Sequence, residues 1–234
     1  MGDVADNWCR VGERAARAAV RVGRDPASVR IVAVSKTKPI AMIEAAIAAG
    51  ATDVGENYVQ EAEPKIRAIG RRVTWHMVGH LQRNKAARAV ELFDVIQAVD
   101  TLALAQVLSR QGERRGVPVC VLVEVNVGGE ASKHGIRPAD AAAFVTALGD
   151  LRGLRVDGLM AIPPPATSAD AARPSFRAVR ALRDRLLPGA PPNAPLQDLS
   201  MGMTDDFEVA IEEGATIVRV GRAIFGARAF GARA

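Results

Sequence analysis

Two closely spaced lysines are the first residues in this sequence with distinctive chemistry. The stretch "RIVAVSKTKP" (30–39) places Lys36 and Lys38 directly after an apolar run. Lysine and arginine together number 31, but only five of these residues are lysines. Unlike arginine, lysine can lose its proton and attack a carbonyl carbon to form a Schiff base. A lysine at the end of a β-branched run is therefore a candidate nucleophile.

The two lysines differ in their position relative to the predicted strand, because Lys36 lies just after its end and Lys38 falls in the turn beyond. If residues 31–34 form a strand, Lys36 has the same parity as Val32 and Val34 and points to the same side. Desolvation on an inward side would lower the pKa of its amine below the reference of about 10.4 and favour the free base. An ordinary exposed lysine at a strand end is the alternative. Lys38, which precedes a proline at a helix start, fits that alternative better.

Two glycine-containing segments near the C-terminus could bind an anion. "LSMGMTDD" (199–206) offers the hydroxyl of Ser200, and "VRVGRAIFG" (218–226) offers backbone N–H groups at Gly221 and Arg222 where a helix begins. Glycine permits close approach to the backbone, and a helix N-terminus favours an anion. We expect a phosphate site there, although a glycine after a strand is more often a turn.

The histidines and one pair of aspartates suggest other chemistry. His76 and His80 have the i, i+4 spacing of a helical zinc site, but they span a strand and a glycine. We therefore expect no shared metal, a structural His76 and a His80 that lines a rim, with His134 in another rim segment. Asp205 and Asp206 resemble paired catalytic carboxylates, but their position is more typical of the first turn of a helix.

The elements that must position these residues alternate between strands and helices. β-Branched runs predict eight strands at 31–34, 52–54, 73–78, 95–99, 119–125, 156–160, 196–199 and 217–220. Helical periodicity predicts helices between them at 40–50, 59–69, 84–92, 102–115, 138–148, 168–187 and 205–213, and an additional helix at 8–22. Eight such units predict an α/β fold, a closed (β/α)8 TIM-type barrel with its functional residues at the C-terminal ends of the strands. We expect a single domain over 1–234, with a folded core of about 8–226 and a fraying repeat, "FGARAFGARA", at the end.

Composition argues against several functional classes. The net charge of +5 comes from arginines scattered along helical segments, and aromatic residues are only 4%, so nucleic-acid binding is not expected. Cys9 and Cys120 lie far apart without a metal-type partner nearby, which predicts neither a disulfide framework nor a metal site. No segment reaches the ~20 apolar residues of a membrane helix, and no apolar signal core is present, which predicts a cytoplasmic protein.

Seven motifs in one order resemble a single protein family. They are "VAVSKTKP", "GENYVQE", "WHMVGHLQRNK", "VEVNVGGEASKHG", "GLMAIPPP", "LSMGMTDDFEVAIEEGA" and "RVGRAIFG", and they span about residues 32–226. The chain strongly resembles the pyridoxal phosphate homeostasis proteins, which are single-domain relatives of the barrel domain of alanine racemase and ornithine decarboxylase. The resemblance implies a TIM-type barrel that carries pyridoxal 5'-phosphate (PLP) as an internal aldimine on Lys36.

The resemblance also implies roles for individual residues. Arg219 would face the pyridine nitrogen of PLP, and Asn57 would lie near the ring. Ser200 and the backbone at Gly221 and Arg222 would hold the phosphate. Family members commonly have a small hydroxyl residue at the position of Arg222, so a backbone contact survives here and a hydroxyl contact does not. The guanidinium of Arg222 either adds a contact to the phosphate or turns outward.

Two functions from different classes are compatible with this resemblance. In the first, the protein is a non-catalytic carrier that buffers PLP, passes it to recipient apoenzymes and so maintains vitamin B6 and amino-acid homeostasis. In the second, it is a PLP-dependent amino-acid racemase, which needs a base on each face of the α-carbon. A lysine aldolase on the same barrel is a third hypothesis, and it would not require PLP.

The residues favour the carrier. Because Arg219 stays protonated, it can donate to the ring nitrogen but cannot accept from it, which makes the ring a weaker electron sink. Alanine racemase takes its second base, a tyrosine, from an additional C-terminal domain, whereas the only tyrosine here is Tyr58, beside Asn57. Since the dimer contacts of those relatives involve the additional domain, we also expect a monomer.

Overall fold

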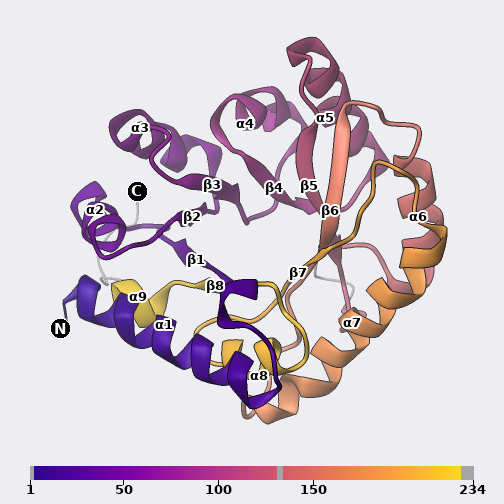
Figure 1. Cartoon of the computed structure of the whole chain (residues 1–234). Helices are drawn as coiled ribbons and strands as arrows, with labels where there is room; N and C mark the ends of the chain where they lie inside the picture. Colours follow the sequence, from indigo (N-terminus) through magenta and orange to yellow (C-terminus); the bar gives the residue numbers. More distant parts are fainter. Residues whose placement is uncertain (1–2, 131–133, 228–234) are drawn as a thin grey trace.

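The computed structural model describes residues 3–130 and 134–227, in which parallel strands close into a barrel surrounded by helices (Figure 1). Each strand pairs with the next along the chain, and β8 pairs back with β1. The strands are β1 (Arg30–Val34), β2 (Asp53–Glu56), β3 (Thr74–Met77), β4 (Val95–Val99), β5 (Val119–Val125), β6 (Leu154–Ala161), β7 (Asp198–Ser200) and β8 (Ile217–Val220). The helices are α1 (Val4–Arg21), α2 (Ile40–Ala48), α3 (Val59–Ile69), α4 (Ala86–Leu92), α5 (Leu102–Arg115), α6 (Ala141–Leu148), α7 (Arg173–Leu186), α8 (Phe207–Glu212) and α9 (Arg222–Phe225). The (β/α)8 TIM-type fold expected from the sequence is confirmed.

Most expected boundaries differ from the structure by a few residues, and the clearest differences have physical causes. Helix α1 begins at Val4 instead of residue 8, because the Asp3 side chain at the N-cap accepts the backbone N–H of Ala5. Strand β7 begins at Asp198 instead of residue 196, because Leu196 has a φ of 48°, which a strand does not accommodate. Most of the repeat expected to fray, residues 228–234, lies outside the described residues.

Two apolar layers hold the barrel together. The smaller layer fills the interior and consists of Val32, Val78, Ala98, Leu122, Met160 and Ile217. The larger layer lies between the strands and the helices and contains Ala33 and the fully buried Trp75. Successive residues of β1 thus face opposite layers, with Val32 and the half-buried Val34 on the inner side, as strand parity predicts. Among the helices within the described residues, none has the length and apolar character needed to cross a membrane.

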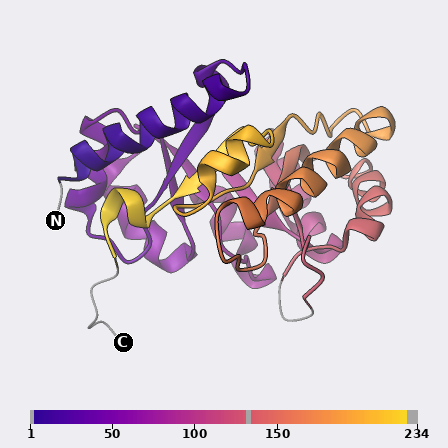
Figure 2. The same ribbon diagram turned by 90° about the horizontal axis from the view of Figure 1, so that it is seen from below.

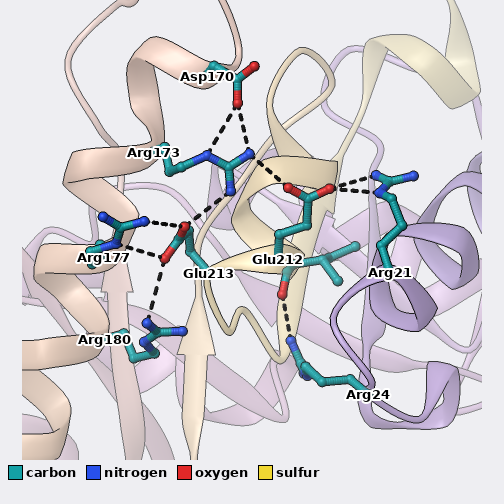
Figure 3. Close-up of polar contacts among 9 residues, drawn as sticks. Arg21, Arg24, Asp170, Arg173, Arg177, Arg180, Glu212 and Glu213 are labelled. Atoms are coloured by element: carbon teal, nitrogen blue, oxygen red, sulfur yellow. Dashed lines mark hydrogen bonds and ion pairs between the residues drawn. The ribbon is translucent and has the colours of Figure 1, made fainter.

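The additional helix α1 packs against α8 and α9, which follow the last two strands (Figures 1 and 2). Arg14 pairs with Glu208 over 2.8 Å, and Arg21 pairs with Glu212 over 2.8 Å. The buried Glu213 receives three arginines of α7 (Figure 3), namely Arg173, Arg177 and Arg180. Many of the scattered arginines therefore link α1, α7 and α8 through ion pairs and help to position the helix that follows β7.

Candidate functional site

The turn after β1 presents Lys36 and gives Lys38 a structural role. The N–H of Lys38 donates to the carbonyl of Ser35 over 3.0 Å, which closes a tight turn around Lys36 and Thr37. Lys36 is half-buried and follows the inward-facing residues of β1. The Nζ of Lys38 donates to the carbonyls at the end of α9, those of Phe225, Gly226 and Ala227, over 2.8 to 3.0 Å. The expectation that Lys38 is an ordinary exposed lysine was wrong, because its half-buried ammonium group binds the carbonyls at the end of α9. Lys36 remains the candidate nucleophile.

A buried ion cluster supports the backbone of this turn. Lys65 of α3 donates to the carbonyl of Ser35 over 2.9 Å and pairs with Glu56 and Glu61 over 2.7 Å each. Glu61 also accepts the N–H of Thr37, whose φ of 62° is uncommon for a β-branched residue. Burial raises the pKa of Glu56, although hydrogen bonds from Lys65 and Ser35 oppose the shift. The cluster therefore holds a strained turn next to Lys36.

The end of β8 lies against the end of β1. Gly221 follows β8 and precedes the first turn of α9. A Cβ on Gly221 would lie only 3.1 Å from the carbonyl oxygen of Val34, the last residue of β1. The close approach of the two backbones therefore favours glycine at this position. The N–H groups at this helix start lie near the strand that leads to Lys36.

The loop after β7 completes a backbone cradle with the start of α9. Gly202 has a φ of 94°, and its carbonyl accepts the N–H of Arg219 over 2.9 Å. The hydroxyl of Thr204 accepts the N–H of Ala223 over 3.3 Å. These contacts tie the loop to the residues on both sides of Gly221. The two glycine-containing segments selected from the sequence therefore converge in the fold.

Two charged side chains near this loop, those of Arg222 and Asp205, are at the surface. Arg222 pairs with Asp205, and both side chains are well exposed, which selects the outward alternative for Arg222. The expectation that Asp205 and Asp206 lie in the first turn of a helix was wrong, because α8 begins at Phe207. Asp206 instead precedes the helix and accepts the N–H of Met203 over 2.6 Å, which closes a turn.

A chain of hydrogen bonds crosses the interior of the barrel below the rim. His76 is fully buried, with Nε2 2.9 Å from Asp53 and Nδ1 2.9 Å from the amide nitrogen of Gln97. The other amide atom of Gln97 accepts the hydroxyl of Ser200 over 2.6 Å. Because Gln97 Nε2 is a donor, Nδ1 of His76 accepts and Nε2 donates to the Asp53 carboxylate. The structural role expected for His76 is confirmed.

Arg219 is a buried cation at the end of this series of hydrogen bonds. It donates to Ser200 over 2.7 Å and to the carbonyl of Ala161 over 2.9 Å. Burial lowers the pKa of Arg219 to about 10, and the charges of Glu124 and Asp206 oppose that shift. Arg219 therefore stays protonated at neutral pH. Burial and the charge of Asp100 raise the pKa of Glu124 to about 7, so this carboxyl is partly protonated there.

Comparison with known proteins places the chain in a family. The family model described as "Alanine racemase, N-terminal domain" matches residues 13–229. The chain is 46% identical to the pyridoxal phosphate homeostasis protein of Pseudomonas aeruginosa, over all of both chains. It is 40% identical to the protein of the same name from Escherichia coli, over 97% of this chain and 98% of the relative. The chain belongs to the pyridoxal phosphate homeostasis protein family.

A solved structure supports this family assignment. PipY of Synechococcus elongatus, solved with PLP bound, superimposes with a TM-score of 0.79 and 38% sequence identity. The superposition covers 92% of this chain and all of PipY. The named relatives and PipY thus match this chain over nearly their whole length.

The residues expected to bind PLP occupy one continuous arc of this family's barrel. Ser200 ends β7, Arg219 lies in β8, Lys36 follows β1, and Asn57 follows β2. Because β8 pairs with both β7 and β1, these strand ends are neighbours around the ring. The side chain of Arg222 is the exception, since it pairs outside the arc.

Cavities flank the rim on both sides of this arc. Asn57 and His80 line a cavity of about 330 Å³, as expected for a rim histidine. Gly79 lies so close to Asn57 that a Cβ on Gly79 would be 2.5 Å from the carbonyl oxygen of Asn57. A second cavity of about 600 Å³ lies between residues 162–169 and Met203.

Sequence reasoning missed two groups of residues. The first is the Glu56, Glu61 and Lys65 cluster, although the i, i+4 spacing of Glu61 and Lys65 on a helix was an available signal. The second is the link from His76 through Gln97 to Ser200. No sequence spacing predicts that link, because it depends on which strands face each other across a closed barrel.

Proposed function

We propose that this protein binds PLP at the mouth of its barrel, covalently through Nζ of Lys36, and acts as a non-catalytic carrier. The observation that carries the proposal is the position of Lys36. It follows the inward-facing residues of β1, whose last residue, Val34, adjoins Gly221, and the buried cation Arg219 lies on the neighbouring strand β8. The PLP complex of PipY, at 38% sequence identity, supports the choice of PLP as the ligand.

The donor set fits a phosphorylated aldehyde. A phosphate dianion needs several N–H or O–H donors. The backbone N–H groups of Gly221 and Arg222 at the start of α9 would supply two of them, since the N–H of the next residue already donates to Thr204. Because Gly221 has no side chain above the Val34 carbonyl, a ligand could approach these N–H groups. Lys36 supplies the amine that would hold the aldehyde carbon. PLP when bound would supply an electron-withdrawing ring and a reactive carbonyl.

Arg219 would limit the use of that ring. Its guanidinium has five N–H donors, of which two bind Ser200 and Ala161. It could therefore donate to the pyridine nitrogen but could not accept a proton from it. Because an unprotonated pyridine withdraws electrons less strongly, carbanion chemistry at a bound substrate is disfavoured. This argument supports a carrier over an enzyme.

The position of Tyr58 argues further against racemisation. Racemisation needs a base on each face of the α-carbon, and Lys36 would provide one. Tyr58 is the only tyrosine of the chain and is 62% exposed at the N-cap of α3. Its side chain lines the open cavity beside Asn57 and not the buried interior that contains Arg219. The carrier would act as a monomer in the cytoplasm and pass PLP to recipient apoenzymes.

The proposal is tested with one matched pair of variants and two assays. Lys36→Arg and Lys38→Arg both keep the positive charge, but arginine cannot hold the aldehyde covalently. PLP titration followed by visible absorption should show a protein-bound band in the wild type and in Lys38→Arg, and none in Lys36→Arg. The wild type should not racemise alanine or serine. Turnover that vanishes in Lys36→Arg would overturn the carrier assignment.

A further inference from the structure

Three metal-ligating side chains gather at the ends of consecutive strands. His80 follows β3, Asp100 follows β4, and His134 lies in the segment after β5. The Nδ1 atoms of His80 and His134 lie 3.7 Å and 3.8 Å from Oδ2 of Asp100. The two imidazole rings stack with centroids 3.7 Å apart and planes inclined by 10°. One ligand atom of each residue lies within 4.8 Å of the other two.

The buried carboxylate of Asp100 would be stabilised by a cation. Its side chain is only 9% exposed, and Oδ1 is buried without a hydrogen-bond partner among the described residues. Oε2 of the nearby Glu124 is also buried without a hydrogen-bond partner among the described residues. A buried carboxylate oxygen without a donor or cation is costly, so native proteins rarely leave one unpaired. The local chemistry therefore favours a cation beside Asp100.

We propose that His80, Asp100 and His134 bind one divalent transition-metal ion, with Zn²⁺ as its representative. Two imidazoles and one carboxylate are a ligand set that suits Zn²⁺, whereas Mg²⁺ and Ca²⁺ prefer oxygen ligands. A tetrahedral site with bonds of about 2.0–2.2 Å places its ligand atoms about 3.3 Å apart. The two separations from Asp100, 3.7 Å and 3.8 Å, need to close by only a few tenths of an ångström.

The surroundings permit that closure. The side chains of His80 and His134 are 38% and 57% exposed, so both rings have room to tilt out of their stack. Asp100, by contrast, is enclosed and would be the fixed ligand. Three protein ligands leave one coordination position for water or another small ligand, which is the pattern of an open zinc site.

The proposed metal site lies across the barrel mouth from the strand end that carries Gly221, although His80 lines the same cavity as Asn57. In a ring of eight strands, β4 lies opposite β8, so Asp100 and Gly221 are on opposite sides of the barrel mouth. His76, the partner that the i, i+4 spacing offers to His80, is excluded because Asp53 and Gln97 occupy both of its ring nitrogens. The ligands of the proposed site instead follow three consecutive strands and meet only in the folded barrel. This inference does not depend on PLP binding.

The proposal is tested by Zn²⁺ titration of the full chain after treatment with a chelator, with and without PLP. Calorimetry should give one Zn²⁺ per chain in both states. Loss of even an outer-shell partner costs about 10–100-fold in metal affinity, so loss of a ligand in His80→Ala, His134→Ala or Asp100→Asn should cost at least that much. Zn²⁺ should also raise the melting temperature of the wild type and not that of the variants.

The exposed thiol of Cys9 is the competing zinc ligand on the surface, and Cys9→Ser is the matched control. Its affinity for Zn²⁺ should equal that of the wild type. The two histidine variants change exposed side chains, so their unfolding transitions in the absence of metal should match that of the wild type. Unchanged affinity in both histidine variants, loss of binding in Cys9→Ser, or the absence of one-to-one binding would each overturn the proposal.

Discussion

Inside the barrel, Arg219 donates a hydrogen bond to the hydroxyl of Ser200 over 2.7 Å, and that hydroxyl donates to Gln97 over 2.6 Å. A hydroxyl has a single proton to donate. The proton of Ser200 is therefore directed into the barrel, where it links the guanidinium to the fully buried His76 and Gln97. The Ser200 hydroxyl therefore orients Arg219 and has no second proton to donate to a phosphate.

We expect Ser200→Ala to destabilise the protein even when PLP is absent. The substitution leaves the buried Gln97 acceptor and one N–H of Arg219 without a partner, and each such group costs about 1–3 kcal/mol. Urea unfolding of PLP-free protein measures the loss. Unchanged stability combined with a large loss of PLP affinity would show that the hydroxyl serves the phosphate and not the interior network.

Lys65→Met should disrupt the turn that presents Lys36. Removal of one partner of a buried ion pair costs about 3–5 kcal/mol, because the other charge stays buried. Here both Glu56 and Glu61 lose their shared cation. The free energy of unfolding and the rate of PLP incorporation should both fall. Lys85→Met is a control at a half-buried lysine and should change the free energy of unfolding by less than about 0.5 kcal/mol.

Gly221→Ala should weaken PLP binding more than it weakens the fold. The φ of Gly221 is −114°, which alanine adopts readily, so the obstacle is the 3.1 Å approach of a Cβ to the Val34 carbonyl. A small shift of α9 would relieve the contact and misplace its first-turn N–H groups. A several-fold loss of PLP affinity with a melting temperature close to that of the wild type is expected. Gly12→Ala, in the open middle of α1, should instead raise stability by about 0.5–1 kcal/mol and leave affinity unchanged.

The arginines around Glu213 predict a pH dependence. Burial alone would raise the pKa of Glu213, but hydrogen bonds from Arg177 and Arg173 outweigh it and lower the pKa below its usual value. A lowered pKa in the folded state contributes stability above the unfolded pKa of about 4.3, and the contribution is lost as pH falls through the folded value.

Glu213→Gln measures that contribution. Because the arginines are partly exposed, the expected loss is only about 1–2 kcal/mol at pH 7. The difference between wild type and Glu213→Gln should be constant above about pH 5 and should close as pH falls further. A difference that grows toward acid pH would contradict the assignment. Urea unfolding across the pH range supplies the measurement.

The fold was predictable because its signals are local. Alternating strand and helix periods identified the eight strands, and parity within β1 identified Val32 and Val34 as its inward residues. What could not be predicted depends on contacts across the ring. The direction of the Ser200 hydroxyl is set by Gln97, three strands away, and the outward turn of Arg222 is set by a carboxylate on another loop.

The histidines illustrate the same limit. In the sequence, His80 has only one close neighbour of its kind, His76, and that pairing is typical of a helix that this segment does not form. Its actual neighbour, His134, follows β5 and is adjacent only after β3, β4 and β5 have paired. Spacing rules apply within an element, whereas this site is assembled between elements.

The identity of the residue that holds PLP is the most direct test of the whole account. PLP-loaded protein is reduced with borohydride, digested and mapped by peptide mass. We expect one pyridoxyl adduct per chain on Lys36, retained in Lys38→Arg and absent in Lys36→Arg. An adduct on Lys38, or no adduct in protein that visibly binds PLP, would contradict the assignment.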